Sequence, residues 1–338
     1  MSRHLPAHPH LDHLKNEAKA LHQAFLRGDP GAVSRVGTAI GSRAALKLTE
    51  AQRVIAREHG FTTWAKLRTH VESTRGFKHA VSAFLAAVGA GDATRAIEAI
   101  RARPDIEQTS LPVAAVLGND SAIRRLLTGN VSSARRRTGN PPLEPLHWLC
   151  YSPFHSESAE RDDGLAASAQ ALLDAGADPN TLDPDHGLPP LYAVTGHRNV
   201  PRIARLLLDA GANPTDGESA FHAAERFHEE SLELLLEFGV DLNYTGEWGN
   251  TPVYFLLQYW DIEREERVRR GLLWLLRHGA HPDVRCGRER ETALHVAVRR
   301  GQSPETLRLL LTMALMSMRD GPTNELRGYS RSAAGETT

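Results

Sequence analysis

Histidine is the residue type of this chain that most suggests chemistry, with 17 copies among 338 residues. Four of them crowd the N-terminus: His4, His8, His10 and His13. These four alternate with prolines and have no acidic or cysteine partner at metal-ligand spacing. His228 is followed by two glutamates, but the second histidine of an HExxH zinc motif is missing. The histidine pattern therefore predicts no metal centre, and nothing else in the sequence predicts a cofactor.

Two groups of carboxylates are the remaining candidates for chemistry. Asp183, Asp185 and His186 could hold a cation, but the same residue types fit a surface turn, which is the interpretation we adopt. The second group could supply a general acid and a general base: Glu157, Glu160, Asp162 and Asp163. A polar loop gives such carboxyl groups little reason for raised pKa values. The motifs GxxxxGK[ST], GxGxxG and GxSxG are absent, so we predict no enzyme and keep an enzyme or effector built on this scaffold as an alternative.

The formal net charge of -1 is the sum of two parts of opposite sign. Residues 1–75 carry 12 Lys and Arg against 6 Asp and Glu, a net +6, whereas residues 76–338 carry 28 against 35, a net -7. The positive charges of the first part are scattered along expected helices, and the run Arg135-Arg136-Arg137 lies in an expected loop. We favour a solvated surface and predict no nucleic-acid partner. A nucleic-acid-associated regulator that uses the basic N-terminal part is the alternative.

Cysteine spacing and hydropathy indicate in which cellular compartment the protein is expected. The two cysteines, Cys150 and Cys286, show no CxxC spacing, which argues against a disulfide framework and against a thiolate zinc site. The first residues contain histidine and proline where a signal peptide needs an apolar core. No run reaches the roughly 18 apolar residues of a membrane helix. We therefore expect a soluble, cytoplasmic protein with no membrane partner.

A short pattern that recurs between residues 145 and 311 organises the chain. It begins five times: Pro145-Leu146-His147, Pro190-Leu191-Tyr192, Ala220-Phe221-His222, Thr251-Pro252-Val253-Tyr254 and Thr292-Ala293-Leu294-His295. The starts are 45, 30, 32 and 41 residues apart. Four of the passes close on a leucine-rich phrase that ends near a glycine: Gly176, Gly211, Gly239 and Gly279. This pattern resembles the ankyrin repeat, whose unit is about 33 residues long.

The resemblance implies an all-α ankyrin-repeat solenoid of helix-turn-helix units joined by short β-hairpin-like loops. Leucines of each second helix would fill the layer between units, the glycines would supply left-handed turns, and the first-helix histidine would tie neighbouring turns together. The two long spacings require insertions, at residues 153–163 and 259–267. Two divergent units precede the clear ones, with helices expected at 80–88 and 94–100, then at 111–117 and 121–127. We expect about seven units and a monomer.

The N-terminal part is expected to form a helical module. Its helices are predicted over 12–27 with Asp12 as N-cap, over 31–36 behind Asp29-Pro30, from the capping box that starts at Thr49, and from Phe61. Residues 51–64, AQRVIAREHGFTTW, resemble a small module found ahead of bacterial ankyrin repeats, with the motif AQxxIAREHGFxxW. Such a module either caps the solenoid or binds a partner itself. The predicted domains are thus 1–75 for this module, 76–318 for the ankyrin repeats and 319–338 for a disordered tail.

The resemblance also implies where a partner binds, because ankyrin domains use the concave face with its hairpin tips and two exposed positions on each first helix. On the first helices these positions are Tyr151 and Ser152, Gly196 and His197, Arg226 and Phe227, Gln258 and Tyr259, and Arg299 and Arg300. On the tips they are Asp183, Asp185, His186, Glu218, Glu247, Trp248, Asn250, Arg288 and Arg290. Aromatic side chains often dominate interface energies, which favours Tyr151, Phe227, Trp248 and Tyr259. Packing against neighbouring helices is an equal alternative for Phe227. The sequence thus predicts a scaffold for an unidentified protein partner.

Overall fold

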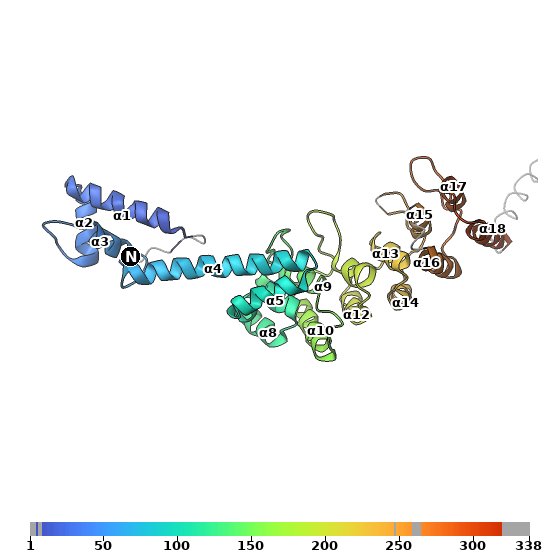
Figure 1. The fold of residues 1–338 in the computed structure, drawn as a ribbon, viewed down its shortest axis with the longest axis horizontal. Coiled ribbons are helices and arrows are strands. Elements are labelled where there is room, and N and C mark those ends of the chain that lie inside the picture. Colours follow the sequence, from blue (N-terminus) through green and yellow to red (C-terminus); the bar gives the residue numbers. More distant parts are fainter. Residues whose placement is uncertain (1–4, 6–8, 247, 259–264, 320–338) are drawn as a thin grey trace, which may run out of the picture. The chain divides into compact units, whose positions relative to one another are not determined.

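The chain folds into helices arranged in two compact units (Figure 1). The computed structural model describes residue 5 and residues 9–246, 248–258 and 265–319. Within these ranges, extended pairing is limited to two isolated bridges, Thr138 with Leu143 and Cys286 with Glu291. The first unit comprises residues 1–83 with 101–103, and the second comprises residues 84–100 with 104–338. The prediction of an all-α fold with hairpin-like loops is confirmed.

The first unit is a small helical cluster around one apolar core. Its helices are α1 (Leu11–Leu26), α2 (Pro30–Ile40), α3 (Leu48–Glu58) and the first part of α4 (Trp64–Gly89). The core consists mainly of Leu14, Ala18, Leu21, Val36, Val54, Ile55, Leu67 and Val71. The first three of these residues recur at steps of four and three, so they share one face of α1. The spacing of these apolar residues therefore gives α1 one buried face.

At two of the three helix starts in this unit, the capping residue differs from the predicted one. Asp12 is not an N-cap, because α1 begins one residue earlier and the His10 ring accepts the Asp12 backbone N–H at 3.3 Å. Thr49 is not a cap either, since the Glu50 carboxylate reaches back to the Lys47 backbone N–H at 2.9 Å and α3 begins at Leu48. Asp29 caps α2 as predicted, with its carboxylate 2.8 Å from the Ala32 backbone nitrogen.

Helix α4 is a single run of 26 residues, although two separate helices were expected over this stretch. Gly76 lies in its middle, and one glycine costs a helix only about 1 kcal/mol. The helix passes through residues 75 and 76 without a break, and the two compact units meet within it, between Ala83 and Phe84. The functional division into residues 1–75 and 76–318 stays a prediction.

The second unit is a series of helix pairs. Its helices after α4 are α5 (Ala93–Ala102), α6 (Asp105–Thr109), α7 (Leu111–Leu117), α8 (Asp120–Gly129), the 3-10 turn η1 (Val131–Arg135), α9 (Pro145–Cys150), α10 (Ala159–Asp174), α11 (Pro190–Tyr192), the π-helix η2 (Ala193–His197), α12 (Pro201–Asp209), α13 (Ser219–Arg226), α14 (Glu229–Glu237), α15 (Pro252–Gln258), α16 (Glu265–Arg277), α17 (Ala293–Arg299) and α18 (Pro304–Arg319). The first helices α7, α9, α11 with η2, α13, α15 and α17 pack in that order. The second helices α8, α10, α12 and α14 form a parallel row. This arrangement is a solenoid.

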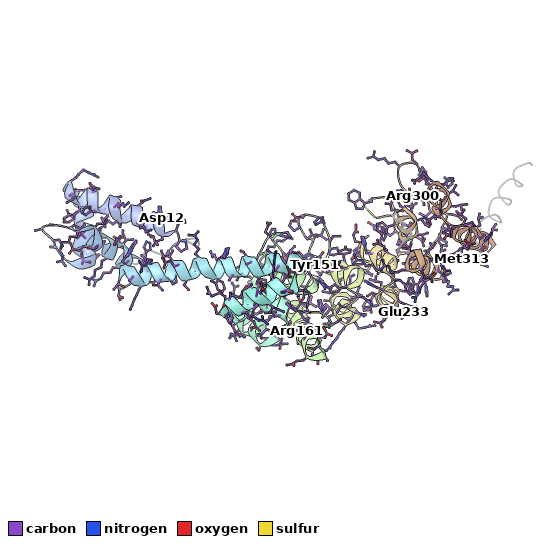
Figure 2. The ribbon with its side chains drawn as sticks, in the orientation of Figure 1. Asp12, Tyr151, Arg161, Glu233, Arg300 and Met313 are labelled. Atoms are coloured by element: carbon purple, nitrogen blue, oxygen red, sulfur yellow. The ribbon has the colours of Figure 1, made fainter. Side chains whose placement is uncertain are left out.

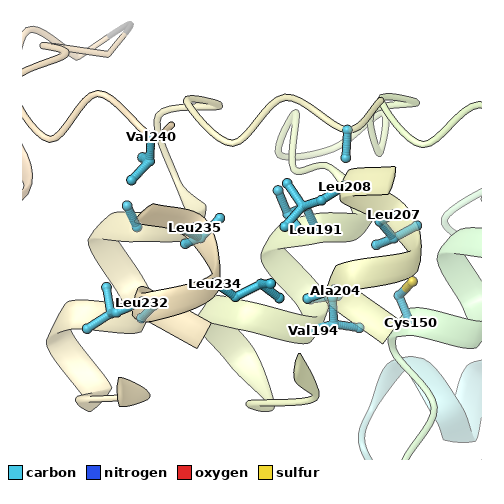
Figure 3. Packing of buried hydrophobic residues seen from close by; sticks show 14 of the residues in the cluster. Cys150, Leu191, Val194, Ala204, Leu207, Leu208, Leu232, Leu234, Leu235 and Val240 are labelled. Carbon is cyan, nitrogen blue, oxygen red and sulfur yellow. The ribbon is translucent and has the colours of Figure 1, made fainter. Parts of the chain in front are cut away.

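The core of the solenoid is a continuous leucine-rich layer between neighbouring pairs (Figure 3). Leu207 of α12 and Leu235 of α14 are fully buried, and the Leu191 side chain of α11 is almost fully buried in the same layer. Burying such a side chain contributes roughly 1.5–3 kcal/mol, which one pair cannot obtain alone. The closing glycines have the predicted left-handed backbone, with φ of 84°, 92°, 79° and 96° at Gly176, Gly211, Gly239 and Gly279.

The first-helix histidine position links neighbouring pairs in some units only. The ring of His147 lies 3.0 Å from the Leu188 carbonyl oxygen of the next unit, as predicted. Tyr254 replaces histidine and still reaches the next unit, because its hydroxyl lies 2.9 Å from the Glu291 carboxylate. His222 instead bonds to Glu225 in its own helix, at 2.9 Å.

The two predicted insertions precede unusually long second helices. Helix α10 has 16 residues and α16 has 13, whereas α12 and α14 have 9 each. Helix α10 begins inside residues 153–163, with the Ser158 side chain as its N-cap. The prediction that the acidic residues there lie in a loop is therefore wrong for Glu160, Asp162 and Asp163. Residues 259–264 lie outside the described residues, as do residues 320–338 of the predicted tail.

A glycine in each long helix allows it to cross the preceding unit closely. A methyl group at Gly164 of α10 would lie 2.5 Å from the Gly118 carbonyl oxygen, and one at Gly271 of α16 would lie 2.0 Å from the Ala224 carbonyl oxygen. Real carbon atoms essentially never come so close, so only glycine fits at these crossings. Among the described residues, no helix has both the length and the apolar content that crossing a bilayer requires.

Candidate partner-binding surface

The hairpin loops of the second unit project on one side of the solenoid, and the second helices lie on the other (Figure 1). We call the first of these the hairpin side. Figure 2 shows Tyr151 and Arg300 toward the hairpin loops, whereas Arg161 of α10 and Glu233 of α14 lie toward the second helices. Two hollows open beside the hairpin loops and the first helices, and most of the predicted partner-binding residues lie in or beside them.

The first hollow, the Arg198 pocket, has a volume of about 370 Å³. It lies between α9 and η2, the first helices of two neighbouring pairs. Its apolar wall includes Val88, Leu143, Trp148 and Leu188, and its polar lining includes Tyr151, Asp183, Asp185, His186, Tyr192, His197 and Arg198. Five predicted residues therefore meet here: Tyr151, Asp183, Asp185, His186 and His197. Arg198 was not predicted.

Tyr151, His197 and Arg226 contact one another in series at the pocket. Tyr151 is half-buried, and its ring centroid lies 6.2 Å from that of His197. The Arg226 guanidinium lies 3.2 Å from His197 Nδ1 and donates to the His197 carbonyl oxygen at 2.8 Å. Because a guanidinium can only donate, Nδ1 is the acceptor and the neutral ring carries its proton on Nε2. Partial burial and the nearby Arg226 charge lower the pKa of His197, which favours this neutral form.

The tip that contains Asp183 is organised by that carboxylate. Its oxygens accept the backbone N–H groups of Asp185 at 3.0 Å, His186 at 2.7 Å and Leu188 at 2.9 Å. Burial opposes the charged form, but these three hydrogen bonds prevail and lower the pKa of Asp183. Asp183 therefore acts as a turn residue, while the side chains of Asp185 and His186 are exposed at the rim of the pocket.

Arg198 is the unusual group of this pocket. It is half-buried, and its Nη2 donates only a long hydrogen bond, 3.4 Å, to the Tyr151 carbonyl oxygen. Its Nε is buried and has no hydrogen-bond partner. No carboxylate of the described residues lies within ion-pair distance of it, and burial lowers the pKa of its guanidinium. A guanidinium in this position is a donor that the protein itself does not satisfy.

Arg198 follows a first helix, α11 with η2, that is one residue longer than that of the last pair, α17 with α18. In the last pair, six positions separate the first-helix His295 from the left-handed Gly301, whereas seven separate Tyr192 from the left-handed Asn199. The π-helix η2 absorbs the additional residue. Gly196 within η2 has no space for a side chain, since a methyl group there would lie 2.8 Å from the His222 Cβ.

The second hollow, the Trp248 groove, has a volume of about 500 Å³ and is lined mainly by Glu218, Phe221, Trp248, Asn250, Tyr254, Phe255, Gln258 and Arg288. The Trp248 side chain is 77% exposed at its hairpin tip. Aromatic rings form the base of this groove, and the centroids of Phe221 and Phe255 are 5.6 Å apart. Glu247 and Tyr259, both predicted to contact a partner, lie outside the described residues.

The other predicted positions differ in how far a partner could reach them. Arg300 is exposed on the hairpin side. Phe227 is half-buried against the core, and the Arg270 guanidinium carbon lies 4.2 Å from its ring centroid, so the packing alternative describes it better. Ser152 is fully buried and donates to the Val116 carbonyl oxygen at 2.7 Å, which makes its predicted exposure wrong.

The sites considered for metal or nucleic acid have structural partners instead. No group of three or more potential metal ligands occurs among the described residues. In the basic run, Arg135 lies 3.4 Å from the Asp178 carboxylate, and Arg137 donates to the Leu182 carbonyl oxygen at 3.1 Å. Cys150 and Cys286 are buried free thiols.

Comparison with known families agrees with the repeat pattern and the stacked helix pairs. Residues 220–263 match the family model "Ankyrin repeats (many copies)", and residues 289–320 match "Ankyrin repeat". The chain contains ankyrin repeats. Together with the helix arrangement, this makes the second unit an all-α ankyrin solenoid. The bacterial origin and the N-terminal module remain predictions.

Two curated relatives match short stretches of this chain. Human "SH3 and multiple ankyrin repeat domains protein 2" is 34% identical over 95 residues, 27% of this chain and 5% of that protein. "E3 ubiquitin-protein ligase KEG" of Arabidopsis thaliana is 31% identical over 120 residues, 34% of this chain and 7% of that protein. The chain thus spans less than a tenth of either relative. Among solved structures, the human ASB11 ankyrin repeat domain is 28% identical, with a TM-score of 0.44, over 60% of this chain and 83% of that domain.

Proposed function

We propose that this chain is a protein-interaction scaffold that binds a partner protein along the hairpin side of its ankyrin solenoid. The observation that carries the proposal is Trp248, which stands 77% exposed at a hairpin tip beside an aromatic groove. A tryptophan exposes a large apolar area to water in this position, and its burial by a partner is favourable. Tryptophan is also among the residues that most often dominate binding energy.

The proposed contact surface includes both hollows. The residues proposed to contact the partner are Tyr151, Asp185, His186, His197, Arg226, Trp248 and Arg300, together with Glu247 and Tyr259 as predicted from the sequence alone. The Arg198 pocket supplies directional polar groups, and the Trp248 groove supplies apolar area. Interfaces combine these two kinds of surface, because apolar burial drives association and polar groups fix its register.

A scaffold role is supported over the two alternatives. In the first unit several basic side chains are already paired, with Arg35 2.8 Å from Glu58, Lys15 3.0 Å from Asp12 and Arg43 3.4 Å from Glu50. Such pairs reduce the positive field that a nucleic acid would contact. For catalysis, the carboxylate of Asp183 is engaged by backbone N–H groups, so it is poorly placed to act as a base.

The test starts with the native partner. The full chain would be used to capture proteins from the cells that make it, and mass spectrometry would identify the one retained. Its dissociation constant would then be measured for Trp248→Ala and for the control Glu233→Ala, an exposed change on the second-helix side. We expect Trp248→Ala to weaken binding about tenfold or more and Glu233→Ala to leave it unchanged. Weakening by Glu233→Ala alone would contradict the proposed face.

A further inference from the structure

We propose that the Arg198 pocket is a receptor for an acidic side chain of the partner, an aspartate or glutamate that stands beside an apolar residue in an exposed peptide segment. This inference rests on the proposed scaffold function and specifies the chemistry of one part of the contact. It follows from the charge balance, the shape and the wall composition of the pocket.

Arg198 is a cation of the pocket lining that has no carboxylate partner among the described residues. Arg198 has a buried Nε without a partner and a weak 3.4 Å contact from Nη2. The Asp183 carboxylate keeps its negative charge, but its oxygens accept three backbone N–H groups and none accepts from Arg198, and Asp185 is exposed to water at the rim. A guanidinium matches the geometry of a carboxylate with two parallel hydrogen bonds. An incoming carboxylate that contacts the terminal nitrogens would therefore give the guanidinium the ion pair that the fold does not supply.

Neighbouring groups add to this preference for an anion. The Arg226 guanidinium fixes His197 with Nδ1 as acceptor, so the neutral ring presents its Nε2 proton as a further donor. The Arg226 charge itself lies within hydrogen-bond distance of His197. His197 and Arg198 thus offer donors of the same kind from consecutive residues at the end of η2.

The apolar wall of the pocket favours an apolar residue next to the acidic residue of the partner. Val88, Leu143 and Leu188 form an apolar surface next to Tyr151 and Trp148. The pocket volume of about 370 Å³ accommodates a side chain beside the carboxylate. An apolar group of the partner would displace water from this wall. Because less water then surrounds the ion pair, the attraction between its charges would be stronger. The preferred segment therefore carries Asp or Glu next to an aliphatic or aromatic residue.

The experiment uses a phage-displayed library of random twelve-residue peptides selected on the full chain. Enriched sequences would be synthesised, each also with its acid changed to the amide, Glu→Gln or Asp→Asn. Binding would be measured by fluorescence anisotropy to the native chain, Arg198→Met, Arg198→Lys and the matched control Arg202→Met. Arg202 is exposed on α12 and pairs with Asp163 outside the pocket.

We expect acidic peptides with an adjacent apolar residue to be enriched. Both the amide peptide and Arg198→Met should weaken binding about tenfold, Arg198→Lys should weaken it less, and Arg202→Met should stay within twofold. The amide peptides test the idea even if Arg198→Met fails to fold. Enriched peptides that lack an acid, or that lose binding with Trp248→Ala, added as a fifth protein, and not with Arg198→Met, would overturn the carboxylate receptor and leave the scaffold function standing. No enrichment at all would count against both.

Discussion

Two arginines that follow first-helix segments on the hairpin side differ in how they are paired: Arg198, which lines the Arg198 pocket, and Arg299, which shares a partner with Tyr254 of the Trp248 groove. Beside the Trp248 groove, the Arg299 guanidinium donates to both oxygens of Glu291, at 3.0 and 2.6 Å, and the same carboxylate accepts the Tyr254 hydroxyl. In the other hollow Arg198 has no carboxylate partner among the described residues, and its Nε makes no hydrogen bond. Arg299 is thus part of a closed polar network beside the Trp248 groove, whereas Arg198 has no ion pair with the described residues that line its pocket.

The difference arises from the number of residues in each first helix. The last pair keeps six positions between His295 and Gly301, and its arginine can fold back onto its own hairpin. The pair of α11 with η2 and α12 has seven positions between Tyr192 and Asn199, and Arg198 lies in a pocket that Asp183 and Asp185 also line, without an ion pair to either. A one-residue insertion can thus turn a structural arginine position into a binding one, without a change of fold.

The largest effect is expected at the close crossing behind the Trp248 groove. Gly271→Ala would place a methyl group 2.0 Å from the Ala224 carbonyl oxygen, so α16 must move away from α13. Overpacking of this kind costs about 3 kcal/mol of unfolding free energy. Urea unfolding followed by circular dichroism measures it, with Gly129→Ala as control because a methyl group there meets no atom within 4 Å. Equal stability of the two variants would show that the crossing is looser than described.

The pH dependence of the unfolding free energy should differ between His147 and His222, which occupy the same position in two repeats. For His147 the expected effect is similar in size to that of Gly271→Ala. Burial lowers the pKa of His147 to about 4, so the folded state binds its proton less readily than the unfolded state does. Stability contributed by neutral His147 is complete above pH 6.5 and is lost as the pH falls from 6.5 to about 4, by about 3 kcal/mol. A flat unfolding free energy over this range would contradict the burial of its neutral ring.

His222 should behave in the opposite way. Burial disfavours its charged form, but hydrogen bonds to Glu218 and Glu225 outweigh burial and raise its pKa. Its contribution is therefore present below pH 6.5 and is lost as the pH rises through the folded pKa. Comparing the pH profiles of unfolding for His147→Gln and His222→Gln with the native chain tests both signs. His147→Gln should flatten the acid limb, and His222→Gln should flatten the limb above pH 6.5.

The smallest effect is expected at the hydroxyl groups of two tyrosines that replace the first-helix histidine. Tyr254→Phe removes the 2.9 Å hydrogen bond to Glu291 and should cost about 1 kcal/mol of unfolding free energy. Tyr192→Phe is the matched control, because the Tyr192 hydroxyl has no hydrogen bond to another group among the described residues. Equal losses in thermal or urea unfolding would show that the link between the last two pairs adds nothing.

Much of the solenoid was predictable because it depends on local pattern. The closing glycines and the leucines of the second helices repeat at fixed offsets, and α7 occupies the residues that its apolar run predicts. Helix starts were less predictable, since His10 and Glu50 compete with other capping side chains at the same ends. Helix α4 continues through Gly76 because packing outweighs the small cost of one glycine.

The candidate site was predictable in part. Tyr151, His197 and Trp248 follow from the repeat register, and the structure places the first two together in one pocket. Arg198 was missed because the register assumes a regular first helix, and the π-helix shifts the residue after His197. The count from the first-helix position to the left-handed residue differs among the pairs, with seven from Tyr192 to Asn199, five from His222 to Phe227 and six from His295 to Gly301. The burial of Ser152 depends on contacts with the preceding pair, which no local pattern contains.

The most direct test of the proposed face is site-specific photocrosslinking in the cells that make the protein. The photoreactive residue p-benzoylphenylalanine would be placed in turn at Trp248, at Arg300 and at Glu233, all exposed in the solenoid. We predict a covalent adduct with the same partner protein from positions 248 and 300, on the hairpin side, and none from position 233. An adduct from position 233 without adducts from the other two would contradict binding through the hairpin side.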